Sequence, residues 1–281
     1  MIERVEWDDL PVEFRTAVEA RTGPVVAAES VAEGLNCSAA LILTTERSGT
    51  HFLKGVRHTD GPGIEALRCE ERINETVGGI SPTIRHRVDA GGWLALAFVY
   101  VPGSHADLGP GSKDLDAVAA ALERMQHLRP PVDVPVPPLV DRFKGFLEPG
   151  EAERLAGDCL LHTDTNPHNL LIDHGGEAYV VDWAMPAIGP AWVDAAYTAV
   201  RLMECEQSPT DALAWLDGIT SWRQADERAV EAFVTATCRH WAAAVGEKDA
   251  EPSNRRVRYL LKYDWPTAAR QPGRRRVRQA L

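Results

Sequence analysis

Three polar residues near the middle of the chain have the types and spacing of a metal-binding catalytic group. Asp164 and Asn169 lie five residues apart, and Asp182 follows after a short apolar segment. Mg²⁺ prefers hard oxygen ligands, takes one or two from the protein and completes its shell with water and nucleotide phosphates. Asn169 and Asp182 could supply those ligands, and Asp164 could accept the proton of an attacking hydroxyl. The pattern indicates phosphoryl transfer.

A predicted β-hairpin would bring these residues together. Residues 170–172 read as a strand, 174–176 as its turn and 178–181 as the returning strand. Because a hairpin places its open ends side by side, Asn169 and Asp182 should be neighbours. The alternative is that such residues only cap turns or end strands, which is the usual use of single Asp and Asn residues. Three residues at mutually consistent spacing, with a hairpin of the right length between them, favour the catalytic interpretation.

The segment from His162 to Asn169 resembles the catalytic loop of the protein-kinase-like superfamily, which has the pattern His-x-Asp-x-x-x-x-Asn followed by a hairpin and an Asp. Its small-residue form looks like that of the aminoglycoside phosphotransferase family. Thr163 stands where that family usually has Gly, and Asp182-Trp183-Ala184 replaces the Asp-Phe-Gly of protein kinases. We expect His162 to orient the loop through a hydrogen bond.

The resemblance runs from about residue 31 to residue 197 and implies an α+β, bilobal protein-kinase-like fold. The expected amino-terminal lobe, residues 1–101, is small and β-rich with one helix and binds the nucleotide. The expected carboxyl-terminal lobe, residues 102–281, is larger and mainly α-helical and carries the catalytic and substrate-binding residues.

A lysine and a glutamate in the first lobe are candidates for holding phosphate. Residues 38–45 and 51–56 read as two strands of a hairpin, and Lys54 shares a strand face with apolar neighbours. A helix expected over 63–77 carries Glu70 on its apolar stripe. Pairing the two would satisfy both buried charges. The resemblance implies that Lys54 then contacts the α- and β-phosphates, whereas the alternative is a solvated edge lysine.

Two further segments are assigned to the nucleotide by resemblance. Gly34 and Asn36 lie in a loop that would cover the phosphates, although this loop has a single glycine and could be a plain connection. Residues 93–101 read as a buried strand that leads into a hinge. The resemblance implies that backbone groups of Val99 and Val101 hold the adenine edge. ATP or GTP, together with Mg²⁺, are the expected cofactors.

The composition is typical of a folded water-soluble protein. Of 281 residues, 44% are hydrophobic and 25% are charged, and the five cysteines lie far apart. Widely spaced thiols predict reduced cysteines and a cytoplasmic location. Acidic residues interrupt the first thirty positions, and no uncharged segment reaches membrane-spanning length, so we expect neither a secretory signal nor a membrane partner.

The charge is unevenly distributed. The net charge is −11, but residues 254–281 hold nine Arg or Lys against one Asp, so the preceding residues carry −19. An acidic body favours cationic partners and disfavours nucleic acid. The basic tail, including Arg274 to Arg276, reads as a solvated terminus or as a phosphate-binding patch.

The carboxyl-terminal helices are assigned from pattern and position. A helix over 195–204 would begin after Asp194, which fits an N-cap, although the resemblance also allows it to brace the catalytic loop. Asp194 and Glu204 are substrate-contact candidates. Further helices are expected over 211–222, 225–245 and 255–262, the last with Val257, Leu260 and Leu261 packed inward.

The predicted function is transfer of the γ-phosphate of ATP or GTP to a hydroxyl of a small molecule. The acidic body and the resemblance favour a cationic antibiotic, an aminoglycoside or a basic cyclic peptide, with resistance by inactivation. The alternatives are a metabolic kinase acting on a sugar, choline or homoserine-like acceptor, and a pseudokinase scaffold. No obligate protein partner is expected.

Overall fold

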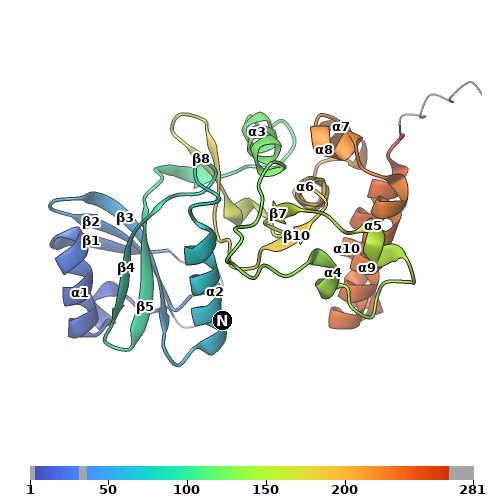
Figure 1. The fold of residues 1–281 in the computed structure, drawn as a ribbon. Helices are drawn as coiled ribbons and strands as arrows, with labels where there is room; N and C mark the ends of the chain where they lie inside the picture. The colour runs from blue at the N-terminus through green and yellow to red at the C-terminus, as the bar shows by residue number, and fades with distance from the viewer. Residues whose placement is uncertain (1–3, 32–36, 266–281) are drawn as a thin grey trace, which may run out of the picture.

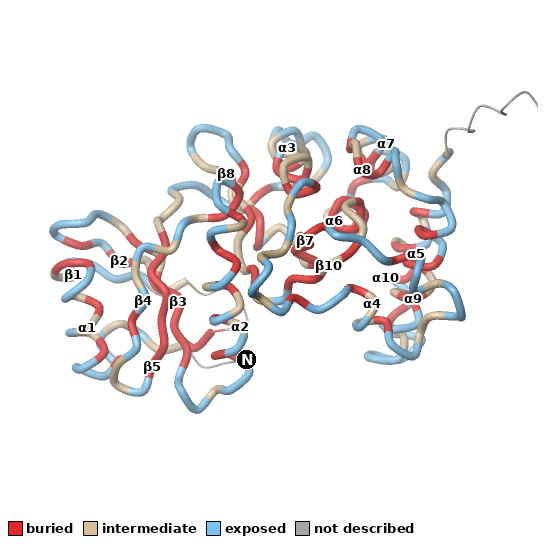
Figure 2. The backbone as a smooth tube through the Cα atoms, in the orientation of Figure 1, coloured by how far each residue is buried: buried red, intermediate tan, exposed pale blue. Residues whose placement is uncertain are grey.

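The computed structural model describes residues 4–31 and 37–265. Figure 1 shows an amino-terminal part built around a sheet and a carboxyl-terminal part built mainly of helices. The buried apolar residues of the first part form two clusters, one on each face of the sheet, and those of the second part form one large cluster. In Figure 2, buried residues follow the central strands of the sheet in the first part. In the second part they follow one central helix, labelled α6 (Val193–Glu204), and the short strands near it, labelled β7 (Cys159–Leu161) and β10 (Ala187–Gly189).

The amino-terminal sheet is five-stranded and antiparallel, with the order β1-β2-β3-β5-β4. Its strands are β1 (Val25–Ser30), β2 (Ala39–Thr45), β3 (Gly49–Arg57), β4 (Ile84–Ala90) and β5 (Trp93–Val99). The predicted hairpin is confirmed as β2 and β3, and the predicted long apolar strand as β5. The apolar run of β5 is continuous because residues 93–98 are buried on both faces of the sheet.

Two α-helices, not the single one expected, cover this sheet. The predicted helix is α2 (Gly61–Ile73), which Asp60 caps by accepting a hydrogen bond from the backbone N–H of Gly63. The additional helix, α1 (Val12–Thr22), follows the short 3₁₀ turn η1 (Trp7–Asp9) and packs Phe14 against Trp93. It buries only Phe14, Val18 and Thr22, so its apolar periodicity was too weak to predict it.

The carboxyl-terminal part contains helices of very different length. They are α3 (Leu115–Met125), α4 (Leu139–Arg142), α5 (Glu151–Arg154), α6 (Val193–Glu204), α7 (Pro209–Asp217), α8 (Thr220–Arg223), α9 (Glu227–Val245) and α10 (Glu247–Tyr259). The central helix α6 is buried along most of its length. Among the described residues, no helix combines the length and the apolar character that crossing a membrane would need.

The end of the chain differs from the prediction. Helix α10 begins at Glu247, eight residues before the expected start, and is followed by the 3₁₀ turn η3 (Leu260–Lys262). Val257 and Leu260 are buried as expected, but Leu261 is 43% exposed. The tighter turn directs successive side chains differently from an α-helix, which explains why the inward position predicted for Leu261 was wrong. The tail residues Arg274 to Arg276 lie outside the described residues.

Short strands between the helices hold the central loops. Strands β6 (Gly103–His105), β8 (Leu170–Asp173) and β9 (Ala178–Val180) form one sheet, and β7 (Cys159–Leu161) pairs with β10 (Ala187–Gly189). The predicted hairpin is confirmed as β8 and β9. A short 3₁₀ turn, η2 (Pro167–Asn169), leads into β8.

Candidate active site

The β8–β9 hairpin brings its two ends together. Leu170 is the register partner of Val180, and the N–H of Val181 donates a hydrogen bond of 2.9 Å to the carbonyl of Asn169. Asp182 is the next residue along the chain. The local pairing predicted from the turn signal therefore sets Asn169 and Asp182 at the same end of the hairpin.

Lys54 connects this hairpin end to the amino-terminal sheet. Its Nζ lies 2.7 Å from Oε2 of Glu70 on α2 and 2.5 Å from Oδ1 of Asp182. The side chains of Lys54 and Glu70 are 9% and 7% exposed. Burial lowers the pKa of Lys54, but the two carboxylates outweigh burial and raise this pKa above its ordinary value. The lysine is therefore a fixed positive charge that contacts both parts of the molecule.

Asp182 occupies a strained turn. Its φ of 64° lies in the left-handed region, where a residue with a Cβ costs roughly 1 to 2 kcal/mol. The following Trp183 anchors the turn, because its indole N–H donates a hydrogen bond of 3.0 Å to the carbonyl of Val180. Its buried ring also packs edge-on against His162, with the ring centroids 4.8 Å apart. This packing holds the carboxylate of Asp182 toward Lys54.

Thr163 adopts the backbone conformation of a glycine. Its φ is 70°, a value that glycine adopts without strain. This conformation explains why the aminoglycoside phosphotransferase family, which this loop resembles, usually has Gly at the position. Two hydrogen bonds offset the strain of a β-branched residue there: the N–H donates to Oδ1 of Asp194 at 2.7 Å, and the hydroxyl donates to the carbonyl of Met185 at 2.9 Å.

Asp164, the predicted base, has a partly exposed carboxylate. Its side chain is 35% exposed, and its Oδ1 accepts a hydrogen bond of 3.0 Å from the amide nitrogen of Asn166. The amide nitrogen of Asn169 lies 3.2 Å from the other oxygen, Oδ2, and 2.9 Å from the carbonyl of Asp164. Because its nitrogen is engaged with Asp164, Asn169 keeps its amide oxygen for another ligand.

These residues fit a magnesium ion. Among residues 4–31 and 37–265, no group of three His, Cys, Asp or Glu side chains could hold a metal by itself. Mg²⁺ does not require such a group, since it takes one or two protein oxygens together with phosphates and water. The amide oxygen of Asn169 and the carboxylate of Asp182 are hard donors in the wall of the pocket described below.

Asp194 lies inside α6 and is not its N-cap, which corrects the preferred prediction. The N-cap position is Trp192, and the carboxylate of Asp194 accepts hydrogen bonds from the backbone N–H groups of His162 and Thr163 at 2.8 and 2.7 Å. Burial raises the pKa of Asp194, and the charge of His162 and these N–H donors lower it in part. The side chain is 3% exposed, so the substrate contact predicted for it is replaced by a positioning role.

His162 connects both segments of the site. Its Nε2 is 2.9 Å from the carbonyl of Val181, and its Nδ1 accepts a hydrogen bond of 3.2 Å from the N–H of Asp164. The ring therefore holds the loop before Asp164 against the chain before Asp182. This geometry agrees with the orienting role expected from the sequence.

A cavity of about 380 Å³ lies between the two parts of the molecule and is large enough for a nucleotide. Lys54, Glu70, Asn169 and Asp182 all contribute to its wall. Phe52 and Phe98 also line it, and their ring centroids are 6.4 Å apart. The residues predicted to bind phosphate and metal thus meet at one cavity.

The structure removes one of the two backbone N–H groups predicted to meet adenine. Val99 and Val101 both line the cavity, but the N–H of Val99 donates to the carbonyl of Thr83 at 2.8 Å and is not available to adenine. Val101 makes no backbone hydrogen bond to the described part of the chain. Gly34 and Asn36 lie outside the described residues, although Val31 and Cys37 on either side of that segment line the cavity.

Glu204, a predicted substrate contact, is paired with Arg201, a cation that was not among the predicted site residues. Its Oε2 lies 2.6 Å from Arg201 of the same helix, and the second nitrogen of Arg201 lies 3.4 Å from Oδ1 of Asp164. The seven-residue spacing of Asp194 and Arg201 on one helix face was the signal that could have placed Arg201 beside the loop.

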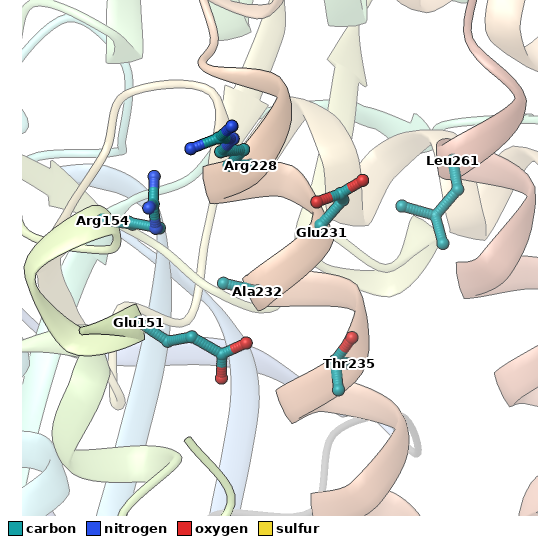
Figure 3. Close-up of a pocket in the computed structure, with 7 residues that line it drawn as sticks. All are labelled: Glu151, Arg154, Arg228, Glu231, Ala232, Thr235 and Leu261. Carbon is teal, nitrogen blue, oxygen red and sulfur yellow. The ribbon is translucent and has the colours of Figure 1, made fainter. Parts of the chain in front are cut away.

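A second hollow, of about 450 Å³, lies away from this site between α5, α9 and η3, as Figure 3 shows. It is wide open to solvent and contains none of the predicted site residues. Its lining includes Glu151, Arg154, Arg228 and Glu231.

Comparison with known proteins agrees with the geometry. Residues 150–244 match the model of the phosphotransferase enzyme family. This segment contains Asp164, Asn169 and Asp182. No curated protein matches the sequence of the chain.

Solved structures match over nearly the whole chain. A thermostable mutant of aminoglycoside phosphotransferase APH(4)-Ia, in complex with AMP-PNP and hygromycin B, has a TM-score of 0.60 and 12% identity, covering 88% of this chain and 97% of that one. Choline kinase LicA from Streptococcus pneumoniae has a TM-score of 0.56 and 11% identity, covering 88% and 99%. Macrolide 2′-phosphotransferase MphH from Brachybacterium faecium has a TM-score of 0.52 and 16% identity, covering 89% and 98%.

At these identities the solved structures show a shared fold. The predicted α+β, protein-kinase-like fold is therefore confirmed, with one more helix in the amino-terminal part than expected. The chain therefore has the fold of these structures, and its segment 150–244 is similar to the phosphotransferase enzyme family.

Proposed function

We propose that the chain transfers the γ-phosphate of ATP or GTP to a hydroxyl of a small molecule. The observation that carries the proposal is the ammonium of Lys54, which lies between Glu70 and Asp182 at the wall of a nucleotide-sized cavity. In this proposal residues 1–101 form the nucleotide-binding lobe and residues 102–281 the catalytic lobe. The presence of AMP-PNP in the aminoglycoside phosphotransferase complex supports a nucleotide donor.

Each residue then has one role. Lys54 holds the phosphates, and Glu70 holds Lys54. Asn169 and Asp182 would bind Mg²⁺, which neutralises charge on the nucleotide phosphates when it is bound. Asp164 accepts the proton of the acceptor hydroxyl. The hydroxyl oxygen forms a bond to the γ-phosphorus, and the bond between that phosphorus and the nucleoside diphosphate breaks.

Two acceptor classes are supported by different observations. A cationic antibiotic, with resistance by inactivation, is supported by the acidic charge of the body and by the aminoglycoside named in one similar structure. A metabolic acceptor is supported by choline kinase among the similar structures. Within this class, Arg201 beside Asp164 favours an anionic acceptor over a cation such as choline. Both classes agree with a cytoplasmic location, where ATP is available.

The test is a transfer assay on a library of hydroxyl compounds that includes cationic antibiotics and charged metabolites. With ATP or GTP and Mg²⁺, we expect formation of a nucleoside diphosphate and a phosphate monoester on one acceptor class, identified by ³¹P NMR and mass spectrometry. Tight nucleotide binding without transfer to any member of the library would contradict the proposal and favour a scaffold.

A further inference from the structure

Two arginines approach the catalytic loop without lining the nucleotide cavity. Arg201 lies on α6 and Arg142 lies at the end of α4. Neither contributes to the wall of the cavity that contains Lys54. Both instead contact the surroundings of the loop that carries Asp164, the base that an acceptor hydroxyl would have to approach.

Arg201 is held in place beside the base. One of its terminal nitrogens lies 2.6 Å from Glu204, and the other lies 3.4 Å from Oδ1 of Asp164. The Arg201 side chain is 37% exposed. The longer contact to Asp164 is weaker than an ordinary charged hydrogen bond, so part of the guanidinium remains able to bind another oxyanion.

Arg142 approaches the same loop from another element. Its guanidinium donates to the carbonyl of Met185, which also accepts a hydrogen bond from the hydroxyl of Thr163, the residue before Asp164. Among the described residues, Arg142 forms no ion pair with a carboxylate. Burial lowers its pKa, and the charges of Tyr197, Asp194 and Asp164 oppose this shift.

A half-buried guanidinium that lacks a carboxylate partner is unfavourable unless an anion completes its environment. The planar fork of arginine suits carboxylate and phosphate groups, because two parallel N–H donors can meet two oxygens. A cationic acceptor, in contrast, would have to bring its charge next to both Arg142 and Arg201. Like charges at close range disfavour that complex.

We propose that Arg142 and Arg201 form a subsite for an oxyanion carried by the acceptor. The acceptor is then a small hydroxyl compound with a carboxylate or phosphate group, oriented so that its hydroxyl meets Asp164. This inference rests on the proposed phosphotransferase function and selects anionic metabolic acceptors over cationic ones, whether antibiotics or a metabolite such as choline. Arg142 and Arg201 act as specificity-determining residues.

The test compares acceptors that differ only in the anionic group. L-Homoserine is compared with L-homoserinamide, and glycerol 3-phosphate with glycerol, by steady-state kinetics and by calorimetric binding in the presence of ADP. In at least one pair we expect the anionic member to have a kcat/KM about 10- to 100-fold higher, which corresponds to one or two charged hydrogen bonds. The pair that shows the preference distinguishes carboxylate from phosphate as the group bound.

Variants locate the preference. Arg142→Met and Arg201→Met should remove most of it by raising KM for the anionic member, and Arg142→Lys should restore part of it. Arg239→Met is the matched control, since Arg239 is an exposed arginine that binds Glu148 and the carbonyl of Phe146. Thermal unfolding of each variant verifies that it is folded.

Three outcomes separate the claims. Equal kcat/KM values within both pairs, or a preference that survives both Met substitutions, would overturn the subsite and leave the phosphotransferase function standing. Binding of the anionic members that is lost in Arg142→Met supports the subsite even without turnover. Absence of transfer to any acceptor would then count against the proposed function alone.

Discussion

At the scale of single residues, Lys54 explains most of the candidate site. The alternation of its strand and the helical stripe of Glu70 were sufficient to predict their pairing, because both patterns are local. The contact of Lys54 with Asp182 could not be predicted in this way, since the two residues are 128 positions apart and meet only when the two parts of the molecule pack. Val99 shows the same limit: its N–H is used by Thr83, a partner that the pattern of its own strand does not reveal.

Replacing Lys54 with Met should destabilise the protein markedly. The substitution leaves the buried carboxylate of Glu70 without a cation, and breaking a buried ion pair in this way costs roughly 3 to 5 kcal/mol. Urea unfolding measures the change in the free energy of unfolding. Arg124→Gln is a suitable control, because it breaks an exposed pair with Glu177 whose contribution should be about 0 to 1 kcal/mol. A loss for Lys54→Met no greater than that of the control would contradict the buried pair.

The same pair predicts how stability depends on pH. The pKa of Lys54 is raised in the folded protein, so its contribution to stability is fully present below the ordinary lysine pKa of 10.5 and is lost as the pH rises toward the folded pKa. The difference in unfolding free energy between the wild type and Lys54→Met should therefore be constant from about pH 8 to about pH 10, below the ordinary lysine pKa. It should shrink as the pH rises above that ordinary pKa. A difference that grows at alkaline pH would contradict a raised pKa.

At the scale of elements, the β8–β9 hairpin and α6 position the catalytic loop. The hairpin was predictable because a Gly-containing turn between two apolar runs is a short-range signal. The bracing role of Asp194 was not predicted, since an acidic residue at the start of a helix is more often an N-cap and was interpreted as one. The structure decides between them by placing its carboxylate on the N–H groups of His162 and Thr163. Strands β1 and β4 were missed because their exposed residues hide the apolar alternation.

Replacing Asp194 with Asn should slow turnover with little effect on nucleotide binding. The amide has one acceptor oxygen and cannot accept from both N–H groups with equal geometry, so the loop that carries Asp164 shifts. Misplacement by about 1 Å can cost roughly 10²-fold in rate. Kinetic assays and nucleotide titrations measure the two effects separately.

A matched control for this loop is Asp226→Asn. Asp226 caps α9 by accepting a hydrogen bond of 2.9 Å from the N–H of Ala229, and Asn caps helices about as well as Asp does. Unchanged turnover in the control with a large loss in Asp194→Asn supports the bracing role. Equal turnover in both variants would show that the contact at Asp194 does not position the loop.

At the scale of the whole molecule, the fold places a cavity between a sheet-containing part and a helical part. The acidic charge of the body first indicated a cationic acceptor, but Arg201 contacts Asp164, and Arg142 binds the Met185 carbonyl that also accepts from Thr163. Net charge reports the average surface, whereas acceptor selectivity depends on the few groups that face the acceptor. The fold could be predicted from the catalytic loop because its motif and the following hairpin are local. The acceptor could not, because Arg142 and Arg201 come from separate helices.

Binding of a nucleotide at this cavity should stabilise the whole molecule. A ligand at 100 times its Kd, bound by the folded state alone, adds about 2.7 kcal/mol to the free energy of unfolding. We expect ATP with Mg²⁺ to raise the melting temperature more than ATP with EDTA, because Asn169 and Asp182 would hold the metal. Equal melting temperatures with and without chelator would argue against the metal role of these residues.

The most direct measurement is a comparison of Asp164→Ala with the wild type, using nucleotide titration and single-turnover transfer on the same preparation. The account predicts unchanged nucleotide affinity and a rate of transfer that is lower by about 10² to 10⁴, the usual cost of removing a general base. Asp133→Ala, which alters an exposed aspartate of a surface loop, serves as the control. Undiminished transfer by Asp164→Ala would contradict the central claim that this carboxylate receives the hydroxyl proton.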